Sequence, residues 1–148
     1  MNYRDDLVVV DSSVVLSALL PGATAAPDAL LAGWVASGVE MAAPALWQYE
    51  VVSVLRRSVY AGHITTADAR EMVEDVRALG VRLYGDDLSE AALEWAERLG
   101  QSKAYDAFYV ALAERLGAVL WTADRRLANG AGAAGAPWVR WTGGPETN

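Results

Sequence analysis

The sequence has no cysteine among its 148 residues, which excludes disulfide bonds and thiolate metal sites. It has a single histidine, so a metal site built on several histidines is excluded as well. No apolar stretch approaches the roughly 20 residues of a membrane-spanning helix. The charged residues 4–6, which precede the first apolar run, are unlike a signal peptide. These absences predict a protein with no membrane segment that works in a reducing cytoplasm.

Basic residues are also scarce. Lys and Arg number 12 against 19 Asp and Glu, which gives a formal net charge of −7. A general positive field that attracts nucleic acid is therefore excluded, and contact with nucleic acid would need a local basic patch or metal ions. The candidates for such a patch are Arg56, Arg57, Lys103, Arg125 and Arg126. The chain has six tryptophans, which could stack on unpaired bases or pack in the core or against a partner.

Short apolar segments alternate with segments of helical periodicity along the chain. Most of the apolar segments have no polar face, which is typical of strands buried on both faces of a parallel sheet. The alternation predicts an α/β fold in a single domain, residues 1–148, whose central parallel sheet is covered by helices on both faces. The predicted strands are Leu7–Asp11, Val39–Ala42, Val81–Tyr84, Ala118–Thr122 and Trp138–Trp141.

Helix signals lie between these strands. Pro44 suits a first helical turn, and Thr65 or Thr66 and Ser102 suit N-caps. Glycine follows the helical segments, as expected for a left-handed residue after a helix. The low-complexity stretch "ANGAGAAGA" predicts a flexible loop before the last strand. The predicted helices are Pro27–Ser37, Pro44–Tyr60, Thr66–Leu79, Leu88–Leu99 and Lys103–Leu116.

Four acidic residues stand out by their positions. Asp11 ends the strand "LVVVD", and Asp124 comes two residues after the strand "AVLWT". Because ligands of open parallel sheets bind outside the carboxyl ends of the strands, both acids are expected at one edge. Glu50 and Asp106 lie among apolar neighbours in predicted helices. Each has a plain alternative. Asp11 could be an ordinary strand-end acid or N-cap, and Glu50 could be a solvated helix residue. Asp106 could complement its helix dipole, and Asp124 could be the N-cap of "RRLA".

A cluster of four carboxylates needs compensation. Two carboxylates about 4 Å apart repel by roughly 4 kcal/mol at an effective dielectric constant of 20. Protonation, basic partners or a cation would relieve this repulsion. Ligand sets made only of oxygen suit Mg²⁺ or Mn²⁺, and these ions support phosphodiester cleavage.

The sequence resembles the PIN-domain ribonucleases, and especially the VapC-type toxins of bacterial toxin–antitoxin pairs. The motifs "VVVDSSVV", "PALWQYEVVSVL", "SKAYDAFYVALAERLG" and "LWTADRRLA" carry the resemblance in order, from near residue 7 to near residue 141. The resemblance implies a three-layer α/β/α fold and a metal-dependent endoribonuclease. By that resemblance, Asp11, Glu50, Asp106 and Asp124 are the catalytic and metal-binding acids.

The resemblance also implies roles for other groups. Ser13 and Thr122 match hydroxyl positions that support the acids. The cofactor is expected to be Mg²⁺ or Mn²⁺, and the partners to be an RNA substrate, a VapB-like antitoxin and a second copy in a homodimer. An activated water would leave a 5′-phosphate and a 3′-hydroxyl.

Two other function classes stay open at this point. A catalytically silent PIN-like module would bind RNA or a protein without cleaving it, although retention of all four acids disfavours this reading. A receiver-like domain would use Asp11 as a phosphoacceptor, but the expected acidic pair before it is replaced by valines 8–10.

Overall fold

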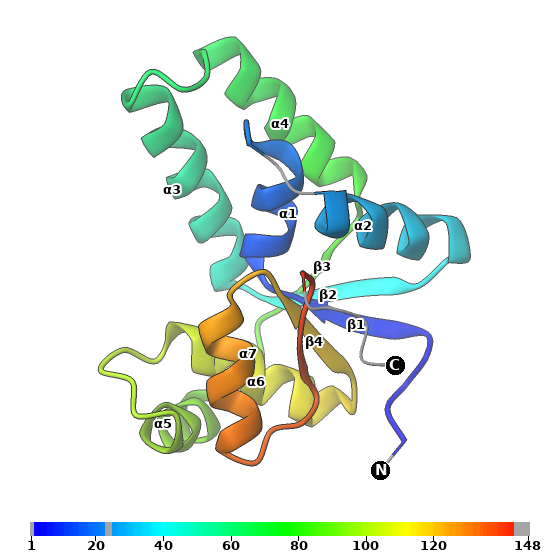
Figure 1. The fold of residues 1–148 in the computed structure, drawn as a ribbon, viewed down its shortest axis with the longest axis vertical. Helices are drawn as coiled ribbons and strands as arrows, with labels where there is room; N and C mark the ends of the chain where they lie inside the picture. Colours follow the sequence, from blue (N-terminus) through cyan, green and yellow to red (C-terminus); the bar gives the residue numbers. More distant parts are fainter. Residues whose placement is uncertain (1, 23–24, 144–148) are drawn as a thin grey trace.

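A five-stranded parallel sheet runs through the middle of the protein in the computed structural model, which describes residues 2–22 and 25–143 (Figure 1). The strand order is β3-β2-β1-β4-β5, so β1 is central and β5 forms one edge. Along the chain, the five strands occur where the sequence predicts them, with small differences at their ends. The strands are β1 (Leu7–Val10), β2 (Glu40–Pro44), β3 (Arg82–Tyr84), β4 (Val119–Thr122) and β5 (Val139–Trp141).

Helices cover both faces of the sheet (Figure 1). One layer is formed by α1–α4 and the other by α5–α7, with α6 packed against β1, β2 and β4. The predicted three-layer α/β/α architecture is therefore confirmed. The helices are α1 (Ser12–Leu19), α2 (Ala25–Ser37), α3 (Leu46–Tyr60), α4 (Thr66–Ala78), α5 (Ser89–Arg98), α6 (Tyr105–Leu116) and α7 (Arg125–Ala133).

The core lies along β1 and β4, whose apolar side chains are enclosed by both helical layers. All four residues of β1 are buried, which explains why this strand has no polar face in the sequence. Most tryptophans also belong to the core. Trp34, Trp47, Trp95 and Trp138 are buried, whereas Trp121 and Trp141 are partly exposed. Core packing is thus confirmed for four of the six tryptophans.

Several predicted boundaries are wrong. The low-complexity stretch is not a loop, because α7 covers most of it. The side chain of Asp124 caps this helix, and Leu127 and Ala131 are buried beneath it, which offsets the low helix propensity of its glycines. Pro44 ends β2 instead of opening α3. The helix expected from Lys103 begins at Tyr105, after Ala104, so Ser102 is not its N-cap.

Other local predictions are confirmed. Thr65 is the N-cap of α4, and its hydroxyl and the Asp68 carboxylate form a capping box. Gly62, Gly80 and Gly117 have positive φ angles at helix ends. Within residues 2–22 and 25–143, no helix combines the length and apolar character needed to cross a membrane.

Candidate active site

Asp11 is a buried carboxylate directly after the central strand. Its side chain is 5% exposed. Its Oδ2 accepts hydrogen bonds from Thr122 Oγ1 at 2.7 Å and from Ser13 Oγ at 2.9 Å, and Ser12 Oγ lies 3.4 Å from Oδ1. Although Asp11 occupies the N-cap position of α1, its side chain does not cap that helix. Asp11 is instead held by hydroxyl groups, two from α1 and one from β4.

Asp124 lies at the same edge of the sheet, two residues beyond β4. The Thr122 hydroxyl that donates to Asp11 also accepts a hydrogen bond from the backbone N–H of Asp124, at 3.0 Å. The Asp124 side chain caps α7, with Oδ1 accepting from the backbone N–H groups of Arg126 at 2.9 Å and Leu127 at 3.3 Å. The carboxyl ends of neighbouring strands β1 and β4 thus place both acids side by side, as predicted.

Glu50 reaches the site from the first turns of α3. Its Oε1 accepts hydrogen bonds from Tyr109 Oη, at 2.5 Å, and from Ser12 Oγ, at 3.4 Å. Tyr109 lies on α6, on the opposite side of the sheet, and is fully buried. A solvated helix position is therefore wrong for Glu50, because its carboxylate is half-buried against α1 and α6.

Asp106 lies in the first turn of α6. Its Oδ2 accepts a hydrogen bond from Gln101 Nε2 at 3.2 Å. The other polar atom of that amide, Gln101 Oε1, is buried and has no hydrogen-bond partner among the described residues. The amide orientation is fixed by the carboxylate, which only accepts hydrogen bonds when ionised.

The four carboxylates share one pattern of anchoring. In each, one oxygen accepts at least one hydrogen bond from a protein donor, at distances between 2.5 and 3.2 Å for the shortest bond of each acid. Among the described residues, no hydrogen bond reaches Glu50 Oε2, Asp106 Oδ1 or Asp124 Oδ2. Asp11 Oδ1 has only the long contact with Ser12. Each acid is thus oriented by the protein while one of its oxygens stays available to another ligand.

The acids also act on one another electrostatically. Burial raises the pKa of Asp11 above its usual range, against the opposing effect of its hydroxyl donors. Burial raises the pKa of Glu50, and the negative charges of Asp11 and Asp106 raise it further. Burial also raises the pKa of Asp106, with contributions from Asp11 and Asp124. The structure thus brings Glu50 within electrostatic range of Asp11 and Asp106, and Asp106 within range of Asp11 and Asp124.

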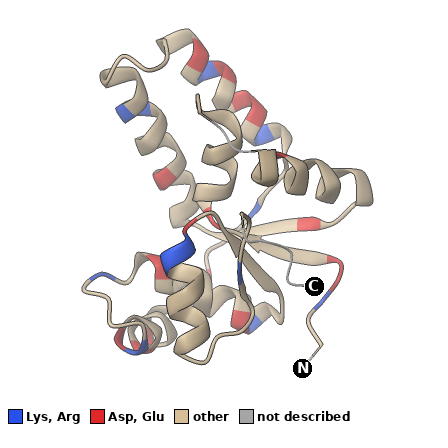
Figure 2. Ribbon diagram, viewed as in Figure 1, with Lys and Arg blue, Asp and Glu red and all other residues tan. Residues whose placement is uncertain are grey.

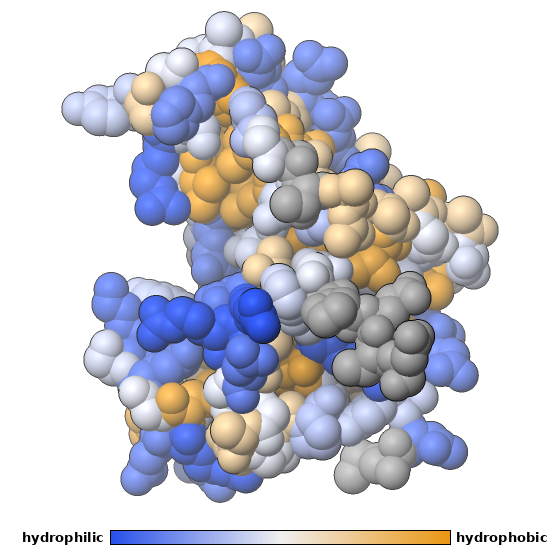
Figure 3. All heavy atoms as spheres, viewed as in Figure 1, coloured by the Kyte–Doolittle hydropathy of each residue, from blue (hydrophilic) through white to orange (hydrophobic). Residues whose placement is uncertain are grey.

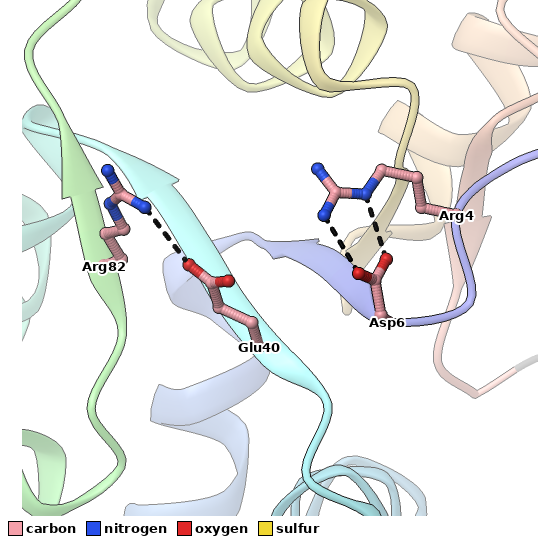
Figure 4. Close-up of polar contacts among 4 residues, drawn as sticks. All are labelled: Arg4, Asp6, Glu40 and Arg82. Atoms are coloured by element: carbon pink, nitrogen blue, oxygen red, sulfur yellow. Dashed lines mark hydrogen bonds and ion pairs between the residues drawn. The ribbon is translucent and has the colours of Figure 1, made fainter.

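The opposite edge of the sheet provides a contrast. Near the amino ends of the strands, Asp6 pairs with Arg4 at 2.9 Å, and Glu40 faces Arg82 at 3.7 Å (Figure 4). Among the described residues, no ion pair involves any of the four acids at the carboxyl edge. Arginines therefore neutralise acids near the amino ends of the strands, whereas the four acids near the carboxyl ends have no basic partner within residues 2–22 and 25–143.

Three residues of the site were missed by sequence reasoning. Ser12 and Gln101 carried no distinct signal, because short polar residues are common at helix starts and in loops. Tyr105 and Tyr109 are four residues apart in the sequence, a spacing that predicts two packing residues on one helix. Tyr105 is 61% exposed, so packing is wrong for it. Tyr109 is buried as expected, but its hydroxyl also binds Glu50.

Comparison with known proteins places this site in a family. The PIN domain model matches residues 8–133. A VapC ribonuclease from Mycobacterium bovis is 36% identical over 124 residues, which span 83% of this chain and 90% of the relative. A ribonuclease VapC3 from Mycobacterium tuberculosis is 41% identical over 88 residues, or 60% of this chain and 63% of the relative.

Two solved structures share the fold. PAE2754 from Pyrobaculum aerophilum has a TM-score of 0.64 at 26% identity, covering 83% of this chain and 78% of that one. A toxin–antitoxin complex from Klebsiella pneumoniae has the same TM-score of 0.64 at 15% identity, covering 90% and 95%, and is similar in fold alone. Since the domain model spans all four acids and the M. bovis relative aligns over most of both chains, this chain belongs to the PIN-domain family.

Proposed function

We propose that this protein is an endoribonuclease toxin that hydrolyses RNA phosphodiester bonds and is neutralised by an antitoxin. Its curated relatives are named as VapC ribonucleases. The observation that carries the proposal is the set of four carboxylates at the carboxyl edge of the sheet, each oriented through one oxygen and none paired with an arginine or lysine among the described residues.

A divalent cation, Mg²⁺ or Mn²⁺, is the ligand that we propose for this site. The available donors are all carboxylate oxygens, which these ions prefer. Within the described residues, no group of three or more acidic or histidine side chains could hold an ion as it stands. Mg²⁺ commonly uses only one or two carboxylates and completes its shell with water and substrate phosphate. Asp11 and Asp106 would hold the ion, with Asp124 and Glu50 beside them.

When bound, the cation would lower the pKa of water and stabilise the charge that develops on the phosphate. The protein's own groups prepare the site for this chemistry. Thr122 and Ser13 fix the orientation of the Asp11 carboxylate. Tyr109 fixes Glu50, which we propose orients the attacking water, and Gln101 fixes Asp106. Attack by water, rather than by the RNA 2′-hydroxyl, would leave a 5′-phosphate and a 3′-hydroxyl.

We propose that an apolar surface of the layer formed by α1–α4 binds the antitoxin. Figure 3 shows hydrophobic surface among α1, α3 and α4, facing the hydrophilic surface of the lower helical layer. A cavity of about 300 Å³ is lined mainly by apolar residues of α3, α4 and β3, including Trp47, Val51 and Val73. Val51 directly follows Glu50 in α3. We infer that an antitoxin fills this groove and places a basic side chain among the acids, where it would replace the cation.

We also propose a homodimer, which light scattering of the purified protein would test.

The proposed function is tested by incubating purified, antitoxin-free protein with total cellular RNA in Mg²⁺, Mn²⁺ or EDTA. We expect cleavage with either ion, none in EDTA and none with Asp11→Asn. The silent-module alternative expects RNA binding without cleavage under all three conditions. Ends carrying a 2′,3′-cyclic phosphate would contradict the proposed attack by water.

A further inference from the structure

The proposed function raises an electrostatic problem at the carboxyl edge of the sheet. An RNA strand carries one negative charge per phosphate, and the acids that would cleave it are negative as well. The whole chain adds to the repulsion with its net charge of −7. A cation at the catalytic centre would offset charge at the scissile phosphate only. The neighbouring phosphates therefore need a basic side chain close to the acids.

Arg125 is placed to meet this need. It directly follows Asp124 and begins α7, where Figure 2 shows basic residues beside an acidic one. Its side chain is exposed and forms no ion pair with another described residue. By contrast, Arg4 and Arg82 are already paired with carboxylates at the far edge of the sheet.

The position of the Arg125 guanidinium is set by Trp141. The guanidinium carbon lies 4.8 Å from the centre of the Trp141 ring, a distance typical of cation–π contact. Trp141 ends the edge strand β5 and lies opposite Thr122, whose hydroxyl binds Asp11. The Arg125–Trp141 pair thus lies at the edge strand β5, next to β4, whose carboxyl end leads to Asp124 and whose Thr122 binds Asp11.

The indole itself is closely packed by backbone. A Cβ at Gly143 would lie 3.0 Å from Trp141 Cζ2 and 3.2 Å from Cε2, so only glycine fits there without displacing the ring. The ring is only partly exposed, although β5 is an edge strand. Trp141 therefore provides a fixed surface on which the long Arg125 side chain rests.

We propose that Arg125, held over Trp141, binds a phosphate of single-stranded RNA next to the acids. This inference rests on the proposed function and names the residue pair that positions its substrate. A planar guanidinium presents several N–H donors at once and matches the geometry of phosphate oxygens. Holding it over an indole leaves less side-chain freedom to lose when the phosphate binds. Arg125 contacts the substrate, and Trp141 is a positioning residue.

The chain offers a matched control in the neighbouring pair, Arg140 and Trp121. Arg140 is exposed on β5, and its guanidinium carbon lies 6.0 Å from the centre of the Trp121 ring. Since side chains alternate along a strand, Arg140 faces the opposite side of the sheet from Trp141. Arg140→Ala therefore removes one positive charge, as Arg125→Ala does, but from the strand that carries Trp141 and without touching the proposed contact.

The test is the affinity for a fluorescent single-stranded RNA, measured by anisotropy at several salt concentrations in EDTA. All proteins carry Asp11→Asn, which removes cleavage and one negative charge. We expect Arg125→Ala to weaken binding about tenfold and to make the plot of log K against log salt shallower by about 0.7, the value for one phosphate contact on a single strand. Trp141→Leu should weaken binding less and leave the slope unchanged, because the charge remains. Arg140→Ala should bind like its parent.

Wild-type cleavage of RNA is measured beside this binding. If the wild type cleaves RNA but Arg125→Ala keeps the affinity and salt slope of its parent, the inference is wrong and the proposed function stands. An equal loss in Arg125→Ala and Arg140→Ala would also overturn the inference, because it would show a general charge effect. If the wild type neither binds nor cleaves RNA, the proposed function fails and this inference fails with it.

Discussion

The hydroxyl of Thr122 joins the two central strands at their carboxyl ends, donating to Asp11 Oδ2 at 2.7 Å and accepting from the backbone N–H of Asp124 at 3.0 Å. Thr122 is fully buried, so water cannot replace these bonds. One side chain therefore sets the orientation of one acid and the backbone position of another. The relationship depends on β1 and β4 being neighbours, although 111 residues separate Thr122 from Asp11.

Thr122→Val tests this arrangement with little change in shape. Removing the hydroxyl leaves buried Asp11 with one donor fewer, which should cost about 1–3 kcal/mol in the free energy of unfolding. The cleavage rate should fall by about 10–100-fold, the usual effect of losing a residue that orients a metal ligand. Urea unfolding and RNA cleavage measure the two effects. Thr142→Val is the control, because Thr142 is also buried but forms no hydrogen bond with the acids. Equal losses in both variants would contradict a special role for Thr122.

Tyr109→Phe tests the only hydroxyl that reaches Glu50 from the far side of the sheet among the described residues. Without this donor, the pKa of Glu50 should rise further, because the bond to Tyr109 lowers it. We expect a loss of about 1.5–3 kcal/mol in unfolding free energy, as for hydrogen bonds to charged groups. Cleavage should fall about tenfold or more. Tyr105→Phe on the same helix is the matched control, since Tyr105 is exposed. Wild-type cleavage by Tyr109→Phe would show that Glu50 does not need this anchor.

The raised pKa values of Asp11, Glu50 and Asp106 predict how stability depends on pH. In the unfolded chain, these groups lose their protons near pH values of about 3.9 for Asp and about 4.3 for Glu. In the folded protein they hold their protons to higher pH. Between the pKa values of the unfolded chain and the higher pKa values of the folded protein, the folded state binds more protons. The free energy of unfolding therefore falls as pH rises from about 4 towards neutrality.

Urea unfolding in EDTA across this pH range measures the effect. Asp11→Asn should flatten the decline, because the amide does not ionise. The exposed Asp28→Asn on α2 should leave it unchanged. A stability that rises over the same interval in the wild type would contradict burial as the dominant cause of the shifts.

Mn²⁺ should reverse this loss of stability near neutral pH, where the acids are ionised. A ligand that binds only the folded state stabilises it by about 2.7 kcal/mol at a free concentration one hundred times its Kd. We therefore expect Mn²⁺ to raise the melting temperature near neutrality and much less near pH 4, with EDTA abolishing the rise. Asp106→Asn should remove the effect, and Asp28→Asn should retain it. An equal rise in both variants would place the bound ion outside the acidic cluster.

The sequence was sufficient to predict the sheet, its two helical layers and the position of Asp11 and Asp124 after neighbouring strands, whereas the roles of Glu50 and Asp106 are implied by the family resemblance. Strands buried on both faces are continuously apolar, and acids that follow them must lie at the carboxyl edge. The donors Ser12, Tyr109 and Gln101 could not be predicted in this way. Ser12 and Tyr109 reach Glu50 through tertiary packing, and the Tyr109 contact crosses the sheet between α6 and α3. Gln101 is only five residues from Asp106, but it lies in a loop and carries no periodic signal. Hydrophobic periodicity shows that Tyr109 is buried, but it does not show what its hydroxyl contacts.

Helix α7 covers most of the glycine-containing stretch that the sequence predicts as a loop. Gly130 lies inside α7, its φ is not positive, and a Cβ added there would meet nothing within 4 Å. The glycine therefore offers the fold no close approach, while it increases the conformational freedom of the unfolded chain. Gly130→Ala should stabilise the protein by about 0.5–1 kcal/mol in urea unfolding.

Gly117→Ala provides the opposite case in the same protein. Gly117 follows α6 with a φ of 64°, in the left-handed region where any Cβ is strained. A Cβ there would also meet nothing within 4 Å, so the two glycines differ in backbone conformation and not in available space. We expect Gly117→Ala to destabilise the protein by about 1 kcal/mol. If Gly130→Ala destabilised it as well, residues 125–133 would owe their structure to something other than an ordinary helix, and the loop predicted from the sequence would be the better description.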